Sequence, residues 1–248
     1  MNNELTSANC RLCDRMLGKR QMTNHLKACW EHHTIAVPGK ATPRWFHLVV
    51  EARHAPDYWM HLQAPANCTF GDLDELLRAI WLECCDHLSA FEFPAKRKRP
   101  RLATPYNIAA MFQELAQEAQ RSRSDDAASC NALLGKPLGS RLKQGVVFSH
   151  QYDFGSTTEL ALRVADEHTA PALPGDLKLL ARNEPPAIPC SVCAEPATQL
   201  CLQCGEEGAG GLCEACARRH DCGEEMLVPL INSPRSGVCG YCGPSVEP

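Results

Sequence analysis

The sequence predicts an α+β fold, in which an antiparallel or mixed sheet with two packed helices is flanked by two small zinc-binding modules. Three observations support this fold class: runs of alternating apolar residues, two stretches with apolar residues every three or four positions, and Cys and His pairs at both ends. With 248 residues the chain can form one sizeable core. We divide it into a finger at 1–33, a core at 44–182, a linker at 183–189 and a double-zinc module at 190–243.

Four side chains near the amino end have the spacing of a Cys-Cys-His-Cys zinc finger: Cys10, Cys13, His25 and Cys29. Leu17 and Met22 stand where a ββα finger places its small core. A helix from about residue 21 to residue 30 would carry the last two ligands one turn apart on one face. His32 and His33 are alternative ligands, but Cys29 has the better spacing.

The finger helix is expected to expose three polar side chains: Arg20, Asn24 and Lys27. One interpretation is a helix presented to a DNA groove, although a single finger covers only about three base pairs. The alternative interpretation is a structural or protein-binding finger.

Two strands open the core, at 44–52 and 57–64, and the short loop through Pro56 predicts that they pair antiparallel. The second strand alternates apolar and polar residues, so we expect it to be half-buried.

A helix follows the two strands. Thr69 and Asp72 form a capping box at its start. Its apolar stripe runs from Leu73 to Cys84, which predicts an amphipathic helix. We interpret Cys84 as a core residue and Cys85 as incidental, because neither has a Cys-x-x-Cys partner.

The rest of the core begins with a strand at 86–93 and continues with a basic run: Lys96, Arg97, Lys98 and Arg99. This run predicts either a phosphate-binding patch or a solvated loop.

A second helix is expected at 104–119, because Thr104 and Pro105 make a good helix start. Three further strands complete the core, at 146–154, 158–166 and 176–181.

Four Cys-x-x-Cys pairs lie in the last third of the chain: Cys190/Cys193, Cys201/Cys204, Cys213/Cys216 and Cys239/Cys242. Two such pairs complete a closed zinc site, and their recurrence favours zinc over disulfides or a redox dithiol. Only seven residues separate the first pair from the second, so we expect an interleaved arrangement. One site would then take the first and third pairs: Cys190, Cys193, Cys213 and Cys216.

The other site in this module would take Cys201, Cys204, His220 and a fourth ligand. Through His220 the module resembles the cross-braced B-box and MYND zinc modules, although their usual ending is missing. Cys222 lies two residues beyond His220, which would strain one tetrahedron. Cys239 is distant, but neighbouring glycines permit a tight approach. We choose Cys239, keep Cys222 as the alternative, and assign no role to Cys242.

The sequence argues against a membrane-spanning protein and against a secreted one. No apolar run approaches about 20 residues, and the start has neither a basic nor an apolar signal region. Sixteen cysteines without an export signal indicate a reducing compartment, so we expect a cytoplasmic protein with no membrane partner. Residues 1–44 carry seven Lys/Arg and three Asp/Glu (+4), whereas residues 184–248 carry three and nine (−6). The basic amino end is the better phosphate binder.

Several stretches of the core are also similar to a known family. They are WFHLVVEARHAPDYWMHLQAPANCTFGDLDELLRAIW, the HLxxF motif at 87–91 and the YDFG motif at 152–155. On these residues, positions 44–182 resemble the Ri-plasmid ORF-three-like family, whose members are described as resolvase-like passengers of insertion elements. A subgroup joins such a core to an amino-terminal finger and an ending similar to Asn232–Tyr241. The resemblance implies an α+β fold and a link to mobile elements, but no established activity.

Three functions fit the sequence. The first is a non-catalytic zinc protein that binds DNA through its amino end or another protein through its acidic module. The second is a metal-dependent hydrolase or nuclease using His87, Asp153 and Glu159, which lie near predicted strand ends. The third is a thiol or zinc sensor. We favour the first, because no nucleophile motif is present and the metal ligands are typical of structural sites.

Overall fold

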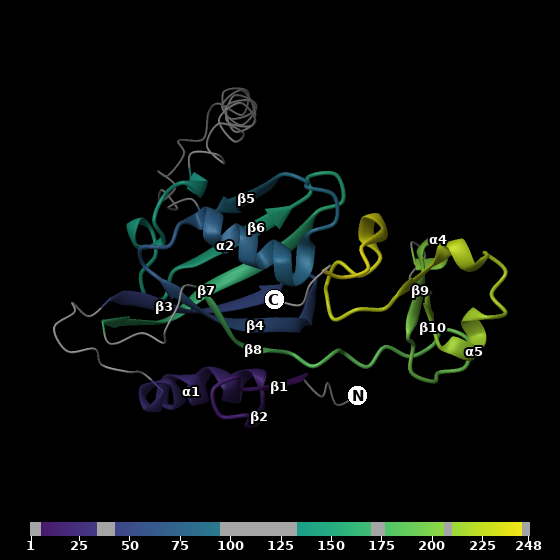
Figure 1. Cartoon of the computed structure of the whole chain (residues 1–248), viewed down its shortest axis with the longest axis horizontal. Helices are drawn as coiled ribbons and strands as arrows, with labels where there is room; N and C mark the ends of the chain where they lie inside the picture. The colour runs from purple at the N-terminus through teal and green to yellow at the C-terminus, as the bar shows by residue number, and fades with distance from the viewer. Residues whose placement is uncertain (1–5, 34–42, 95–132, 170–176, 206–209, 245–248) are drawn as a thin grey trace, which may run out of the picture.

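A six-stranded antiparallel sheet forms the centre of the computed structural model, which describes residues 6–33, 43–94, 133–169, 177–205 and 210–244. The strand order is β5-β6-β7-β3-β4-β8 (Figure 1). The strands are β3 (Arg44–Ala52), β4 (Ala55–Pro65), β5 (Ser89–Glu92), β6 (Val147–Tyr152), β7 (Thr158–Thr169) and β8 (Lys178–Arg182). All neighbouring pairs are antiparallel, so the predicted α+β class is confirmed.

One face of the sheet is covered by a helix that begins at the expected capping box. The backbone N–H of Asp72 donates to Thr69 Oγ1 at 3.1 Å, and the N–H of Thr69 donates to the Asp72 carboxylate at 2.6 Å. The helix runs as α2 (Phe70–Leu77) and continues as the π-helical turn η2 (Arg78–Leu82). The main core lies between these turns and the sheet. The helix stops before Cys84, because the chain becomes extended at Glu83.

The amino-terminal finger covers the opposite face of the sheet. The alternation of apolar and polar residues in the strands did not predict this contact. It consists of β1 (Ser7–Asn9), β2 (Met16–Gly18), α1 (Lys19–Cys29) and the short η1 (Trp30–His32), seen below the sheet in Figure 1. Met22 and Leu26 of α1 pack against Trp45 and Trp59 of the sheet. Both faces of β4 are therefore buried, and the expectation of a half-buried strand was wrong.

The carboxyl-terminal module has its own small sheet in the order β10-β9-β11. Its elements are β9 (Gln199–Cys201), α4 (Leu202–Gly205), β10 (Gly211–Leu212), α5 (Glu214–Ala217), η4 (Glu224–Met226) and β11 (Leu227–Pro229). Its buried cluster consists largely of cysteines, with Leu212 and Ala217. Such a small apolar core needs another source of stability, such as bound metal.

After β11 the chain returns to the core and is held there by polar contacts. Arg235 is fully buried and donates to the Asp153 carboxylate at 2.6 Å, which holds the pKa of Asp153 at about 2. It also donates to the carbonyl of Ser156 at 2.8 Å. Ser233 Oγ donates to the carbonyl of Trp81 at 2.7 Å. The segment 232–241, on which the family resemblance partly rests, therefore joins the module to the core.

Two short turns complete the described elements, η3 (Leu138–Ser140) and η5 (Val238–Gly240). The basic run Lys96, Arg97, Lys98 and Arg99 and the helix expected at 104–119 lie outside the described residues. Within the part that is described, no helix has the length and apolar character needed to cross a membrane.

Candidate metal centres

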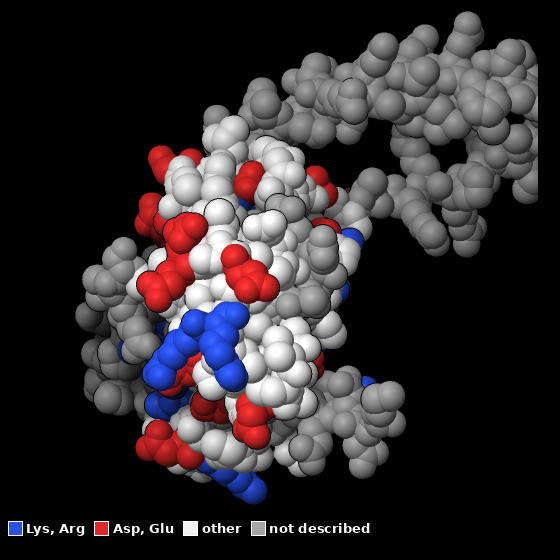
Figure 2. Space-filling model, turned by 90° about the vertical axis from the view of Figure 1, so that its right-hand side faces the viewer, with Lys and Arg blue, Asp and Glu red and all other residues white. Residues whose placement is uncertain are grey.

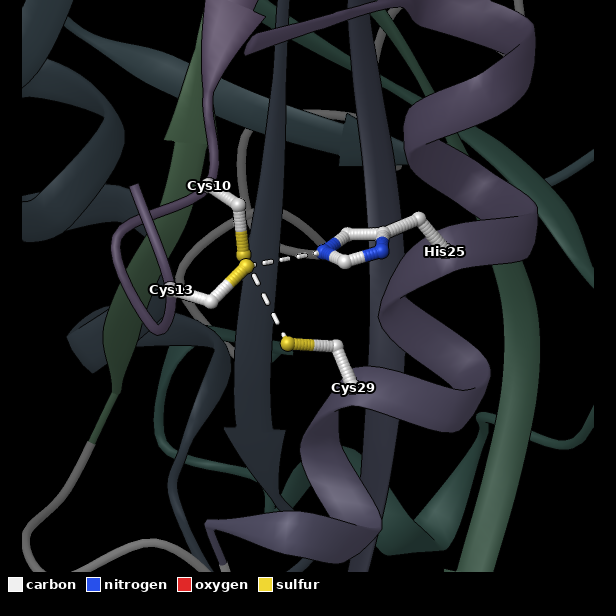
Figure 3. A group of neighbouring side chains, drawn as sticks. All are labelled: Cys10, Cys13, His25 and Cys29. Atoms are coloured by element: carbon white, nitrogen blue, oxygen red, sulfur yellow. Dashed lines mark hydrogen bonds between the residues drawn. The ribbon is translucent and has the colours of Figure 1, made fainter. Parts of the chain in front are cut away.

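The amino-terminal ligands come together as the finger pattern requires. Cys10 and Cys13 lie on the tight turn between β1 and β2, and His25 and Cys29 project from one face of α1 (Figure 3). Cys13 Sγ lies 3.3 Å from His25 Nε2, and Cys10 Sγ lies 4.0 Å from Cys29 Sγ. All four ligand atoms lie within 4.8 Å of one another.

These distances are those of a metal site and not of disulfides. In a tetrahedral zinc site two sulfurs lie about 3.8 Å apart, and a sulfur and a nitrogen about 3.6 Å apart, given bonds of about 2.3 and 2.05 Å. A disulfide would bring two sulfurs to about 2.05 Å. The cysteines of the described residues are all free. The group is therefore compatible with zinc.

Helix α1 positions two of these ligands. His25 and Cys29 stand one turn apart, while Met22 and Leu26 anchor the helix to the sheet. The turn at the other two ligands is fixed by the N–H of Asp14, which donates to the carbonyl of Cys10 at 2.8 Å. His33 lies outside this ligand group, and its Nδ1 lies 2.8 Å from the carbonyl oxygen of Cys29.

The first group of the carboxyl-terminal module contains the four cysteines of the interleaved arrangement: Cys190, Cys193, Cys213 and Cys216. Cys193 Sγ lies 3.6 Å from the sulfurs of both Cys213 and Cys216. Backbone N–H groups of Cys213 and Val192 lower the pKa of Cys190 to about 6, which favours the thiolate that binds metals.

The second group contains Cys201, Cys204, His220 and Cys222. Cys204 Sγ lies 3.4 Å from His220 Nε2 and 3.7 Å from Cys222 Sγ. The structure thus places Cys222 here, and the choice of Cys239 is corrected. The expectation that His220 and Cys222 would strain one tetrahedron was wrong because the chain turns at Asp221. The turn lets the imidazole of His220 and the shorter side chain of Cys222 reach the same point.

The remaining predicted residues lie elsewhere. Cys239 lies beside Cys85 and His87 of the core, at 3.6 Å from each. Cys242 is exposed and belongs to none of the ligand groups in the described residues. The interpretation of Cys85 as incidental did not consider its neighbours. Cys84, Cys85 and His87 are three possible ligands within four residues, but they do not form a Cys-x-x-Cys pair.

The residues proposed for hydrolysis are engaged in ion pairs. His87 Nε2 lies 3.7 Å from Asp153, but that carboxylate already accepts from Arg235. Glu159 pairs with Arg53 at 3.2 Å. Among the described residues no ion pair joins Glu159 to the other two, so the structure does not assemble the expected trio.

The nucleic-acid candidates on the finger lie on the outer side of α1. Arg20, Asn24 and Lys27 are exposed, as expected. Lys27 also forms an ion pair with Asp166 of β7 at 3.6 Å. Its charge is therefore partly compensated by the core.

Comparison with known proteins adds little to this geometry. No model of a known protein family matches the chain. No curated protein matches it. Among solved structures, a protein of unknown function from Methanosarcina mazei is similar at 16% identity, over 56% of this chain and 68% of that chain, with a TM-score of 0.35. The candidate centres are therefore interpreted from their own residues.

Proposed function

We propose that this chain is a non-catalytic zinc protein whose carboxyl-terminal module binds another protein. One observation carries the first half of the proposal: each ligand group described above supplies four protein donors. A catalytic zinc keeps one position open for water or substrate, whereas four Cys or His ligands close a structural site. The engagement of Asp153 and Glu159 in ion pairs also argues against the hydrolase alternative.

The second half rests on a groove on the module, with a volume of about 570 Å³, between β9, β11 and α5. Glu214 and Glu224 line it, and Ala217, Leu227 and Val228 provide apolar surface. Arg218 also lines it and forms an ion pair with Glu214, which leaves Glu224, within the described part of the chain, as the unpaired carboxylate of the lining. Figure 2 shows the molecule from the side of this module, where acidic side chains are scattered over the surface and a prominent basic cluster lies among them. An extended segment with basic and apolar residues is the partner that such a groove favours.

Selection from a displayed random-peptide library tests this proposal. We expect the zinc-loaded chain to enrich peptides rich in Lys or Arg, and we expect Glu224→Lys to weaken their binding by about tenfold or more. Glu195→Lys is the matched control, because it makes the same charge change at an exposed position of the module outside the groove. Equal binding by Glu224→Lys and wild type, or enrichment without basic residues, contradicts the proposal.

Nucleic-acid binding through the finger is the second candidate, favoured by the exposed side chains of Arg11, Arg15 and Arg20. Lys19, however, pairs with Glu51 at 2.8 Å. With about three phosphates contacted, the affinity for duplex DNA should fall roughly fortyfold between 50 and 200 mM salt. Absence of binding at 50 mM salt, measured by fluorescence anisotropy, rejects this candidate.

The resemblance of residues 44–182 to the Ri-plasmid ORF-three-like family stays part of the proposal. It would link the chain to mobile elements. Transposase genes beside the coding sequence would support that link, and their consistent absence would remove it.

A further inference from the structure

The segment that follows the module brings a metal-binding side chain to the core. Cys239 lies in η5, next to the loop that connects η2 to β5. Its Sγ is 3.6 Å from Cys85 Sγ and 3.6 Å from His87 Nε2. With Cys84, these residues place three sulfurs and one ring nitrogen within 4.8 Å of one another.

We propose that Cys84, Cys85, His87 and Cys239 bind a fourth zinc ion, which fastens the carboxyl-terminal segment to the core. The two distances match the edges of a zinc tetrahedron, about 3.8 Å between sulfurs and about 3.6 Å between sulfur and nitrogen. Three soft thiolates and one imidazole are a ligand set that suits zinc. The same set occurs in the finger and in the second group of the module.

The backbone on both sides supports this assignment. Asp86, between Cys85 and His87, has φ 57°, and Cys239 has φ 54°. L-residues rarely adopt this left-handed conformation, and non-glycine examples persist where their surroundings require them. Here the turn at Asp86 lies between two of the three core donors, Cys85 and His87, and the turn at Cys239 presents the fourth donor to them.

Polar groups around the site suit a thiolate ligand. Arg235 Nη2 donates to Cys84 Sγ at 3.5 Å, and the hydroxyl of Tyr152 lies 3.9 Å from the same sulfur. Three thiolates exceed the charge of one zinc ion by one unit, and the hydrogen bond from the buried guanidinium stabilises the thiolate of Cys84. Ion pairing with Asp153 keeps Arg235 in this position.

The position of the site gives it a distinct role. Each of the other three groups takes all its ligands from one module, whereas this group joins the core to a segment 154 residues away in sequence. Zinc here would set how the acidic module sits against the sheet. This role stands independently of what the module binds.

Zinc counting on the full chain tests the inference. After reconstitution with excess zinc and removal of unbound metal, wild type should hold four zinc ions per chain. Cys85→Ser and Cys239→Ser should each hold three. The double variant should also hold three, because both residues serve one ion. Cys242→Ser is the matched control, since it is an exposed cysteine in the same segment and should hold four.

Three zinc ions in wild type, four in either single variant, or two in the double variant overturns the inference. Alkylation of wild type provides a second measurement that needs no variant. Cys85 and Cys239 are exposed, yet a maleimide should label them only after a chelator is added. Labelling of both in the zinc-loaded protein, or a mass showing a disulfide between them, contradicts the site.

Discussion

His220 and Cys222 lie only two residues apart, yet both reach the same ligand group. A turn at Asp221 and the different lengths of the two side chains make this possible. Spacing along the chain is therefore a weak guide where the backbone reverses, and a strong one where a helix fixes the separation, as with His25 and Cys29.

Replacing Cys222 with Ser should remove one zinc ion and unfold the module. Structural zinc contributes about 10–16 kcal/mol of apparent folding free energy in small zinc modules, and this module has little apolar core to replace it. Zinc analysis and hydrogen exchange would check this, with the amides of β3 and β7 expected to stay protected. A Cys222→Ser protein that keeps all its zinc would restore Cys239 as the ligand of the second group.

A buried histidine pair makes the core sensitive to pH. His47 Nε2 lies 2.8 Å from His61 Nδ1, and burial lowers the pKa of His47 to about 4. The unfolded chain, with a pKa of about 6.5, binds more protons in acid, so this contribution to stability is complete above pH 6.5 and falls as the pH drops toward 4. Between pH 8 and 6 the loss is roughly 0.8 kcal/mol for His47.

Denaturant unfolding at pH 8 and pH 6, with zinc retained, measures this loss. His47→Gln should reduce the difference between the two pH values. The control is His54→Gln, whose ring is 82% exposed and so should leave that difference unchanged. An identical pH dependence in His47→Gln and wild type would remove the buried pair as its cause.

Packing of helix α1 should stabilise the sheet as well as the finger. Met22 is fully buried against the sheet tryptophans. Met22→Ala should lower the free energy of unfolding of the core by about 2–5 kcal/mol, because it leaves a cavity between the two elements. Asn24→Ala, on the exposed side of α1, should stay within about 0.5 kcal/mol. If Met22→Ala loosens only the finger, the two elements do not unfold together.

Much of each element was predictable from local patterns. Alternation and a short loop predict the β3–β4 pair, and Thr69 with Asp72 predicts the start of α2. The burial of β4 on both faces was not predictable, because it depends on where the finger docks. The Cys85–Cys239 contact was hidden for a similar reason: 154 residues separate the two cysteines, and no local period relates them.

At the scale of the whole molecule, ion pairs connect three parts: the finger, the core and the carboxyl-terminal segment. Lys19 and Lys27 tie the finger to carboxylates of the sheet. Arg235 ties the carboxyl-terminal segment to Asp153. Lys19 and Lys27, which the sequence suggests for phosphate binding, are thus partly used in ion pairs within the chain.

Zinc X-ray absorption on the purified chain tests the central claim most directly, because it reports the sulfur count and coordination number averaged over all the bound zinc ions. The four ligand groups contain thirteen cysteine sulfurs and three histidine nitrogens, and they leave no position for water. The account predicts four-coordinate zinc bound by sulfur and nitrogen alone, with close to three sulfurs per ion. An average well below three sulfurs per ion, or a coordination number above four, would contradict it and favour an open, catalytic zinc.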